Sequence, residues 1–349
     1  MNKFMSKLQD IVPIIAFVVV LLFFTVKSDG RMLSAFNISL LIEQSIIIVL
    51  IGCGMLFVVA QGSIDLSVGV NLAFSGVISM WASEQLESPY LMIPIAIIVG
   101  LLVGILNGVI VAKLKVPSFM LTLAMLIGLR GIVHKIQFKI NVSYLSPDLY
   151  WLNKPVFEDV ERLQFLTYKM IVFIVILAIM YYVFEFTRVG RNSQAIGENE
   201  IVAKYVGIRV DIMKIAAFGL SGMMSGCAAL FSILNVGGTS QTMGSFTEMK
   251  VAMAIFLGGV LVTGGVTARM YKVILGSFTI TIIVNGLALI SLSQTEVSQS
   301  VEGVLLLLIL FATIIANQRN ARRITPLDDD PEENALTGSA EGNGAVVKV

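Results

Sequence analysis

Long apolar runs follow one another along most of this sequence, and they limit what it can fold into more than any other feature. A helix rises about 1.5 Å per residue, so about 20 apolar residues suffice to cross the ~30 Å hydrocarbon layer of a bilayer. Only 13% of the residues are charged, whereas soluble domains carry about 25%. We therefore expect an all-α polytopic membrane protein.

The apolar runs predict about ten transmembrane helices. Ten spans place both termini on one side, and the excess of Lys and Arg in the segments on that side indicates that it is cytoplasmic. We expect residues 1–324 to form the transmembrane domain and the polar, acidic residues 325–349 to form a disordered tail. The predicted spans are approximately 11–26, 40–60, 68–83, 91–112, 117–136, 168–187, 214–234, 248–262, 272–291 and 298–316.

The spans also repeat weakly within the chain. A shift of about 178 residues lays the second through fifth spans over the seventh through tenth, and it brings Asn107-Gly108 onto Asn285-Gly286. Because the shift covers an odd number of spans, the two halves would cross the membrane in opposite senses. Inverted repeats of this kind are common in transporters and enclose the substrate path between them.

The stretch QGSIDLSVG, residues 61–69, separates two of these runs with glycines, serines and Asp65. A charge at the bilayer centre costs about 2.5–3.5 kcal/mol, and this penalty shrinks where a broken helix lines a pocket inside the protein. The stretch therefore predicts a broken helix. Asp65 is interpreted either as a structural cap of the next helix or as a residue that also faces a permeation path.

Polar side chains within the spans are the candidates for such a path. They can hydrogen-bond a hydroxyl-rich solute or simply satisfy neighbouring helices, and both interpretations remain open. The candidate path residues are Asp65, Ser67, Asn107, Thr122, Asn235 and Asn285.

Residues 188–213 mix charged and apolar side chains at short spacing between two spans. Gly197 and Gly207 are expected to bracket a short amphipathic helix there. Such a helix either docks into a groove of a partner protein or lies on lipid headgroups. Its predicted apolar face consists of Ile201, Val202, Tyr205 and Val206.

Enzymatic activity is not indicated. The chain contains no G-x-x-x-x-G-K-[ST] phosphate loop, and its single histidine, His134, has no neighbouring nucleophile pattern. The net charge of +1 gives no reason to expect a nucleic-acid partner. An ion-coupled secondary transporter is the main alternative to a transporter driven by a separate chain, with Glu43, Asp65, Glu248 and Glu302 as its titratable candidates.

Four stretches, taken in order, carry a resemblance to a known family. They are IDLSVG, residues 101–132 with the pattern K-x-P-x-F-x-x-T-L-x-x-x-x-x-x-R-G, residues 187–222, and AIFLGGVLVTGGVTARMYKVILGSF. Over residues 35–315 the chain resembles the permease subunits of bacterial ABC sugar importers, in the ribose/xylose/galactoside branch. Two positions depart from the family pattern, because Gly62-Ser63 stands where Gly-Gly is frequent and Val266 stands where a glycine is usual.

The resemblance implies a multi-pass permease subunit in the bacterial cytoplasmic (inner) membrane that imports a monosaccharide or sugar-like solute. It implies three kinds of partner: separate nucleotide-binding ATPase subunits that use ATP and Mg, a second permease copy or sister chain, and an extracytoplasmic substrate-binding protein. No cofactor is expected on this chain, and a nucleoside importer remains an alternative. The residues expected to couple the permease to the ATPase are Gly197, Glu198, Glu200, Ala203, Lys204, Tyr205 and Gly207.

Overall fold

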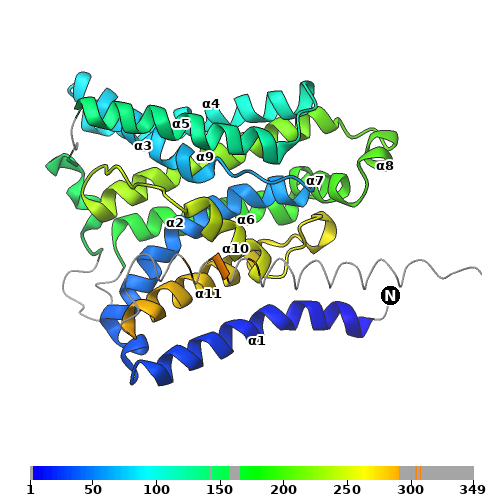
Figure 1. Cartoon of the computed structure of the whole chain (residues 1–349), viewed down its shortest axis with the longest axis horizontal. Coiled ribbons are helices and arrows are strands. Elements are labelled where there is room, and N and C mark those ends of the chain that lie inside the picture. The colour runs from blue at the N-terminus through cyan, green and yellow to red at the C-terminus, as the bar shows by residue number, and fades with distance from the viewer. Residues whose placement is uncertain are drawn as a thin grey trace, which may run out of the picture.

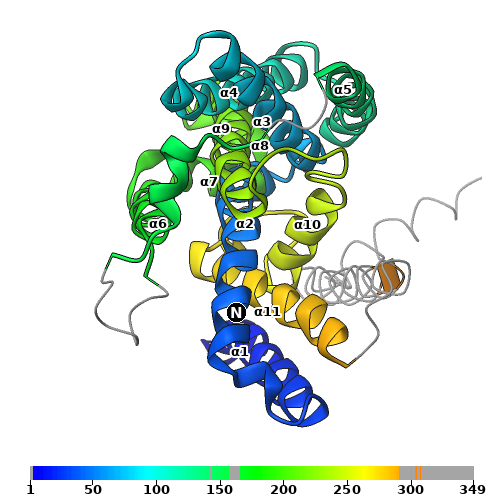
Figure 2. The same ribbon diagram turned by 90° about the vertical axis from the view of Figure 1, so that its left-hand side faces the viewer.

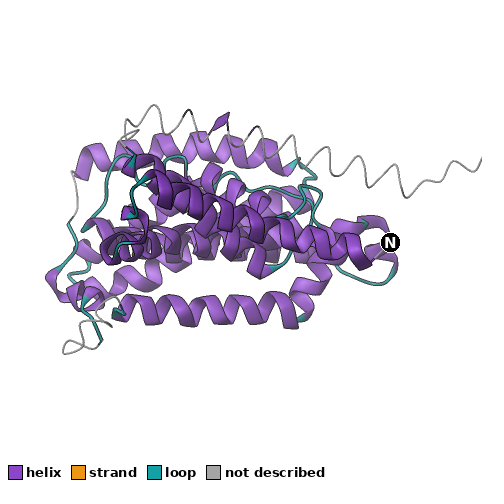
Figure 3. Ribbon diagram, turned by 90° about the horizontal axis from the view of Figure 1, so that it is seen from below, coloured by secondary structure: helices purple, strands orange, loops and turns teal. Residues whose placement is uncertain are grey.

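The computed structural model of this chain describes residues 3–140, 144–156 and 166–290, together with residues 300, 303, 304 and 307. Every regular element within these residues is a helix, so the predicted all-α class is confirmed. Most of the long helices lie along one common direction (Figures 1 and 3). The α-helices are α1 (Lys3–Lys27), α2 (Ala35–Ala60), α3 (Val68–Gln85), α4 (Met92–Lys113), α5 (Ser118–Ile140), α6 (Tyr168–Phe186), α7 (Arg188–Glu198), α8 (Glu200–Tyr205), α9 (Val210–Val236), α10 (Thr247–Leu257) and α11 (Met270–Leu289).

Six of the described helices are long and apolar enough to cross a membrane, so the prediction of about ten spans is not confirmed. They are Ala35–Ala60, Pro89–Lys113, Ser118–Lys139, Tyr168–Phe186, Val210–Val236 and Met270–Leu289. The apolar part of α1 is the shorter stretch Pro13–Lys27. The buried face of α3 carries an asparagine and several serines, which lower its hydropathy. Most of the predicted span 298–316 and the tail 325–349 lie outside the described residues.

The predicted span 248–262 is wrong in its extent. α10 has 11 residues and ends at Leu257, because the chain turns at Gly258-Gly259. The φ angle of Gly259 is +84°, a left-handed conformation that residues with a Cβ rarely adopt. An 11-residue helix is about 16 Å long, roughly half of the hydrocarbon thickness.

The order and packing of the described helices agree with the predicted inverted repeat for three of its four pairs of spans. α4 begins at Met92 and α11 at Met270, 178 residues later. α2, α3 and α4 correspond to α9, α10 and α11, and each half packs on the other: α4 lies on α9, while α11 lies on α2 (Figure 2).

The two halves also run in opposite directions. Lys113, at the end of α4, pairs with Asp211 in the first turn of α9 at 3.4 Å. The backbone N–H of Met270, which starts α11, donates to Glu185 at 3.0 Å, one residue before the end of α6. Since α7, which follows α6 directly, also packs on α9, the end of α4 and the start of α11 lie at the same end of the bundle. The partner expected for α5 lies mostly outside the described residues.

Glycines make the contact between α4 and α9 unusually close. Gly100, Gly104 and Gly108 recur every four residues on α4. Gly100 and Gly104 face Gly222 or Gly226 of α9, and Gly108 faces Ile215 and Phe218 of the same helix. A Cβ atom on Gly104 would meet the carbonyl oxygen of Phe218 and the Cα atom of Gly222. In a membrane, helices gain mainly from van der Waals contact, which small residues allow by letting backbones approach. This interface therefore holds the two halves together.

We expect Gly104→Val to weaken this interface, because the added isopropyl group has no space against the α9 backbone. Overpacking of this kind destabilises a protein by about 1–3 kcal/mol. Gly131→Val on α5 is the matched control, since a Cβ at Gly131 has no described neighbour within 4 Å. The measurement is chemical unfolding of the two purified variants in detergent. Equal stabilities for both variants would contradict the assigned role of the glycine contact.

Candidate functional site

The predicted broken helix is present between α2 and α3. α2 ends at Ala60, and the chain turns through Gln61 and Gly62 before α3 begins at Val68. The N–H groups of Gln61 and Gly62 bond back to the carbonyls of Val58 and Val59 at 3.1 and 2.9 Å. The turn brings the following residues, including Asp65, into the interior of the protein, where Asp65 is only 1% exposed.

Three hydrogen bonds hold the Asp65 carboxylate. Its Oδ1 atom accepts from the backbone N–H of Ser67 at 3.0 Å and from the Ser67 hydroxyl at 2.6 Å. Its Oδ2 atom accepts from the hydroxyl of Ser221, on α9, at 2.9 Å. The Nδ2 group of Asn107, on α4, donates to the Ser67 oxygen at 2.9 Å. We call these four residues the Asp65 cluster, and it joins the start of α3 to both α4 and α9.

The structural interpretation of Asp65 is therefore supported, in a modified form. Asp65 bonds to the N–H of Ser67, the residue just before α3, and so it sets the turn into the helix. The Ser67 hydroxyl does not cap α3, because it donates to Asp65 and accepts from Asn107. All four members of the Asp65 cluster are at most 1% exposed, and burial of a carboxylate is tolerated where it is hydrogen-bonded in this way.

Thr122 lies beside the Asp65 cluster. The start of α5 satisfies the irregular backbone at Ile64: the Ser118 hydroxyl accepts from the Ile64 N–H at 3.3 Å, and the Thr122 hydroxyl lies 3.5 Å from the Ile64 carbonyl. Four of the six candidate path residues, Asp65, Ser67, Asn107 and Thr122, are thus brought together around one backbone segment.

Asn235 and Asn285 lie elsewhere. Asn235, near the end of α9, accepts from Lys169 at 2.9 Å, and Lys169 also forms an ion pair with Glu43 at 2.8 Å. Asn285 is on α11, at the position that the repeat pairs with Asn107. Among the described residues, the buried Oδ1 atoms of both Asn107 and Asn285 lack a hydrogen-bond partner.

The sequence analysis missed Ser221 and Arg130, and it considered Glu248 only as a titratable group. Arg130 of α5 donates to the carbonyls of Met243 and Gly244 at 2.7 and 3.1 Å, in the loop before α10. Glu248, 5% exposed in the first turn of α10, packs against Gly69 of α3 and interacts electrostatically with Arg130. The 178-residue shift could have pointed to Glu248 and the loop before α10, because it lays residues 65–70 over residues 243–248. α3 and α10 thus meet near their N-termini.

The segment after α6 forms two helices in place of the single one predicted. Asn199 separates α7 from α8, and its Oδ1 atom accepts from the N–H groups of Ile201 and Val202, both at 3.0 Å. The prediction that Gly197 starts the helix is wrong, because Gly197 lies inside α7. A Cβ there would collide with the Ala60 carbonyl, so close contact with α2 requires glycine. Gly207 follows the end of α8, as expected.

The predicted apolar face of α8 is exposed. Tyr205 is 88% exposed, Val206 70%, Ile201 66% and Val202 54%. In Figure 1, α8 lies at the far right end of the molecule, beyond α7. We call these four residues the α8 face.

The other predicted coupling residues support α8 from behind. Ala203 is buried against Ile196 of α7 and Val210 of α9. Glu200 bonds to Lys214 at 2.7 Å and to Lys204 at 2.9 Å, and these two bonds lower the pKa of the Glu200 carboxyl group. Glu198 is exposed, and its Oε1 atom accepts from the N–H of Val266 at 2.8 Å.

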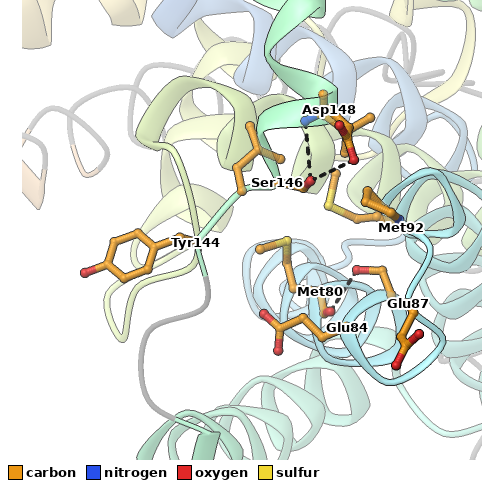
Figure 4. A pocket seen from close by; sticks show the side chains of 11 residues that line it. Met80, Glu84, Glu87, Met92, Tyr144, Ser146 and Asp148 are labelled. Atoms are coloured by element: carbon orange, nitrogen blue, oxygen red, sulfur yellow. Dashed lines mark hydrogen bonds between the residues drawn. The ribbon is translucent and has the colours of Figure 1, made fainter.

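The end of the bundle opposite α8 carries an open cavity of about 290 Å³ between the end of α3 and the segment 144–149. Met80 and Met92 line its apolar part, and Glu84, Glu87 and Asp148 bring three carboxylates to it (Figure 4). The structure therefore has chemically different ends: an apolar helix face at one, and an acidic cavity at the other.

Comparison with known proteins gives a consistent result. Residues 37–310 match the profile of the family described as "branched-chain amino acid transport system / permease component". The fructose import permease protein of Rhizobium meliloti is 29% identical, over 76% of this chain and 74% of that protein. The xylose transport system permease protein of Escherichia coli K12 is 29% identical, over 90% and 93%. The ribose import permease protein of Haemophilus influenzae is 31% identical, over 74% and 79%. No solved structure matches the chain.

We expect Asp65→Leu to destabilise the protein, because the Ser67 and Ser221 donors would lose their acceptor inside the protein. Each buried group left unsatisfied costs about 1–3 kcal/mol. Asp65→Asn keeps one acceptor oxygen and should fall between the native chain and Asp65→Leu. Glu84→Leu, which removes an exposed carboxylate, is the control. Thermal unfolding in detergent measures the order, and native-like stability of Asp65→Leu would remove the Asp65 cluster from the account.

Proposed function

Because this chain belongs to the family of branched-chain amino acid transport system permease components, we propose that it forms the path of an ATP-driven importer for a sugar or sugar-like solute. The names of three relatives, which refer to fructose, xylose and ribose, support a solute of this kind. Like them, the chain is a transporter subunit and not an enzyme. The absence of a phosphate loop from the sequence supports ATP and Mg being used by a separate subunit.

The path is proposed to pass between the two halves, close to the Asp65 cluster. Two observations support this place. The N-termini of α3 and α10 meet there, and interrupted helices at a repeat interface are typical of solute sites in transporters. The unpartnered carbonyl oxygen of Asn107, inside the cluster, can accept a hydrogen bond from a solute hydroxyl, and Asn285 carries an unpartnered oxygen at the equivalent position of the second half.

The α8 face is proposed to dock on a nucleotide-binding ATPase subunit. This face combines an exposed aromatic ring with three branched aliphatic side chains on a short helix, which suits insertion into a groove of a partner protein. The α8 end is then cytoplasmic, and both termini are proposed to lie on that side. A substrate-binding protein would dock at the opposite end, and a second permease copy or sister chain would complete the assembly.

The direct test is uptake by proteoliposomes that contain this chain and its co-encoded ATPase. Radiolabelled ribose, xylose and fructose are supplied together with the partner binding protein. We expect ATP-dependent uptake of one of these sugars that persists when uncouplers remove ion gradients. Uptake by this chain without the ATPase, driven by an ion gradient, would instead show the ion-coupled transporter that the sequence left open.

Docking through the α8 face predicts that Tyr205→Glu prevents association with the ATPase subunit. A carboxylate in place of the ring would be buried without a partner in an apolar groove, at a cost of several kcal/mol. Tyr144→Glu is the matched control, because Tyr144 is 78% exposed and lies at the opposite end. Co-purification of the two subunits is measured. Equal co-purification of both variants would argue against docking at the α8 face.

A further inference from the structure

Three segments far apart in the sequence meet where α7 ends. They are the end of α7, the turn after α2, and the segment 263–268 between α10 and α11. Gly197 touches the Ala60 carbonyl and the Gly265 N–H without an intervening side chain. Gly264 approaches the carbonyls of Val59 and Ala60 in the same way. Because backbone meets backbone, these segments have no flexible side chains between them to absorb a displacement.

We call the place where these three segments meet the junction. Side-chain hydrogen bonds also connect the segments there. Glu198, on α7, accepts from the N–H of Val266 at 2.8 Å and packs against Gly265, where a Cβ atom would collide with the Glu198 carboxylate. Gln194, one turn earlier, donates to the carbonyl of Ala268 at 2.7 Å. Gln61 donates to the Ser193 hydroxyl of α7 at 3.0 Å. A bond to a charged acceptor is about twice as strong as a neutral one, so the Glu198 bond is the strongest of these.

The junction lies between the α8 face and the Asp65 cluster. Ala203 of α8 packs on Ile196 of α7, two residues before Glu198. On the other side, Gln61 lies in the same turn that leads to Asp65, and Asp65 bonds to α9. Every step from α8 to the Asp65 cluster is thus a direct contact or a short stretch of chain.

We propose that Glu198 is a positioning residue that ties α7 and α8 to the 263–268 segment and to the end of α2, so that displacement of α8 moves the Asp65 segment. This inference rests on the proposed docking of an ATPase at the α8 face, and it adds that Glu198 transmits the movement and does not contact the partner. Although Glu198 is exposed, its carboxylate is directed at the Val266 N–H and the Gly265 backbone.

The test uses the full complex in proteoliposomes and measures solute uptake and ATP hydrolysis in the same sample. Glu198→Ala should bind the ATPase subunit normally and hydrolyse ATP, while uptake per ATP falls by roughly tenfold, as expected when one charged hydrogen bond is lost. Glu198→Gln keeps an acceptor for the Val266 N–H and should retain uptake per ATP within about twofold, because a neutral bond replaces a charged one. Lys139→Ala, which removes an exposed charge in the last turn of α5, outside the junction and the acidic cavity, is the control.

The outcomes separate this inference from the docking proposal. Native uptake per ATP in Glu198→Ala overturns the transmission role, and the docking proposal then still stands if Tyr205→Glu loses the ATPase. Loss of ATPase binding in Glu198→Ala also overturns it, because Glu198 would then be a contact residue. If Glu198→Ala fails to fold, Glu198→Gln decides. A tenfold loss of uptake per ATP in Glu198→Gln would overturn the role of the bond to Val266, because glutamine keeps an acceptor for that N–H and only the charge is lost.

Discussion

Backbone polar groups inside a membrane protein must find partners within the protein, and this constraint shapes the centre of the structure. Between the end of α2 and the start of α3, side chains supply the hydrogen-bond partners that a continuous helix would supply to its own backbone. Asp65, Ser67 and Ser221 satisfy one another, and the Ser118 hydroxyl accepts from the Ile64 N–H. An interruption built in this way can be both polar and stable, which is what a path for a hydroxyl-rich solute requires.

The inverted repeat places a similar interruption in the second half. There the loop before α10 is held by Arg130 from α5, and Glu248 occupies the contact with α3. Close glycine packing between α4 and α9 fixes how the halves meet. The α7–α8 segment contacts this arrangement at its edge, through the backbone around Gly197, the Glu198 bond and the packing of Ala203 on Val210, and that position suits a part that transmits movement.

The sequence was sufficient to predict the helical class, the repeat, the break at Asp65 and the apolar α8 face, because each follows from local periodicity or from a fixed shift along the chain. It was insufficient where a contact joins distant residues. Ser221 lies 156 positions from Asp65, and the sequence around neither residue predicts the hydrogen bond between them. Ala203 resembles a surface residue of an amphipathic helix, yet it is buried, and the exposed Glu198 bonds to Val266, 68 positions away. The predicted span 248–262 failed because apolar residues continue beyond the glycine turn that ends α10.

The central claim is that ATP use by a partner moves the Asp65 segment through the α7–α8 end. In a chain lacking its own cysteines (Cys53→Ala, Cys227→Ala), the half-buried Ser63→Cys reports on that segment through its rate of maleimide labelling. With the ATPase subunit present, the account predicts that addition of ATP changes this rate while a cysteine at Ser88, far from the junction, reacts unchanged. Equal labelling of Ser63→Cys with and without ATP, in vesicles that import solute, would contradict it.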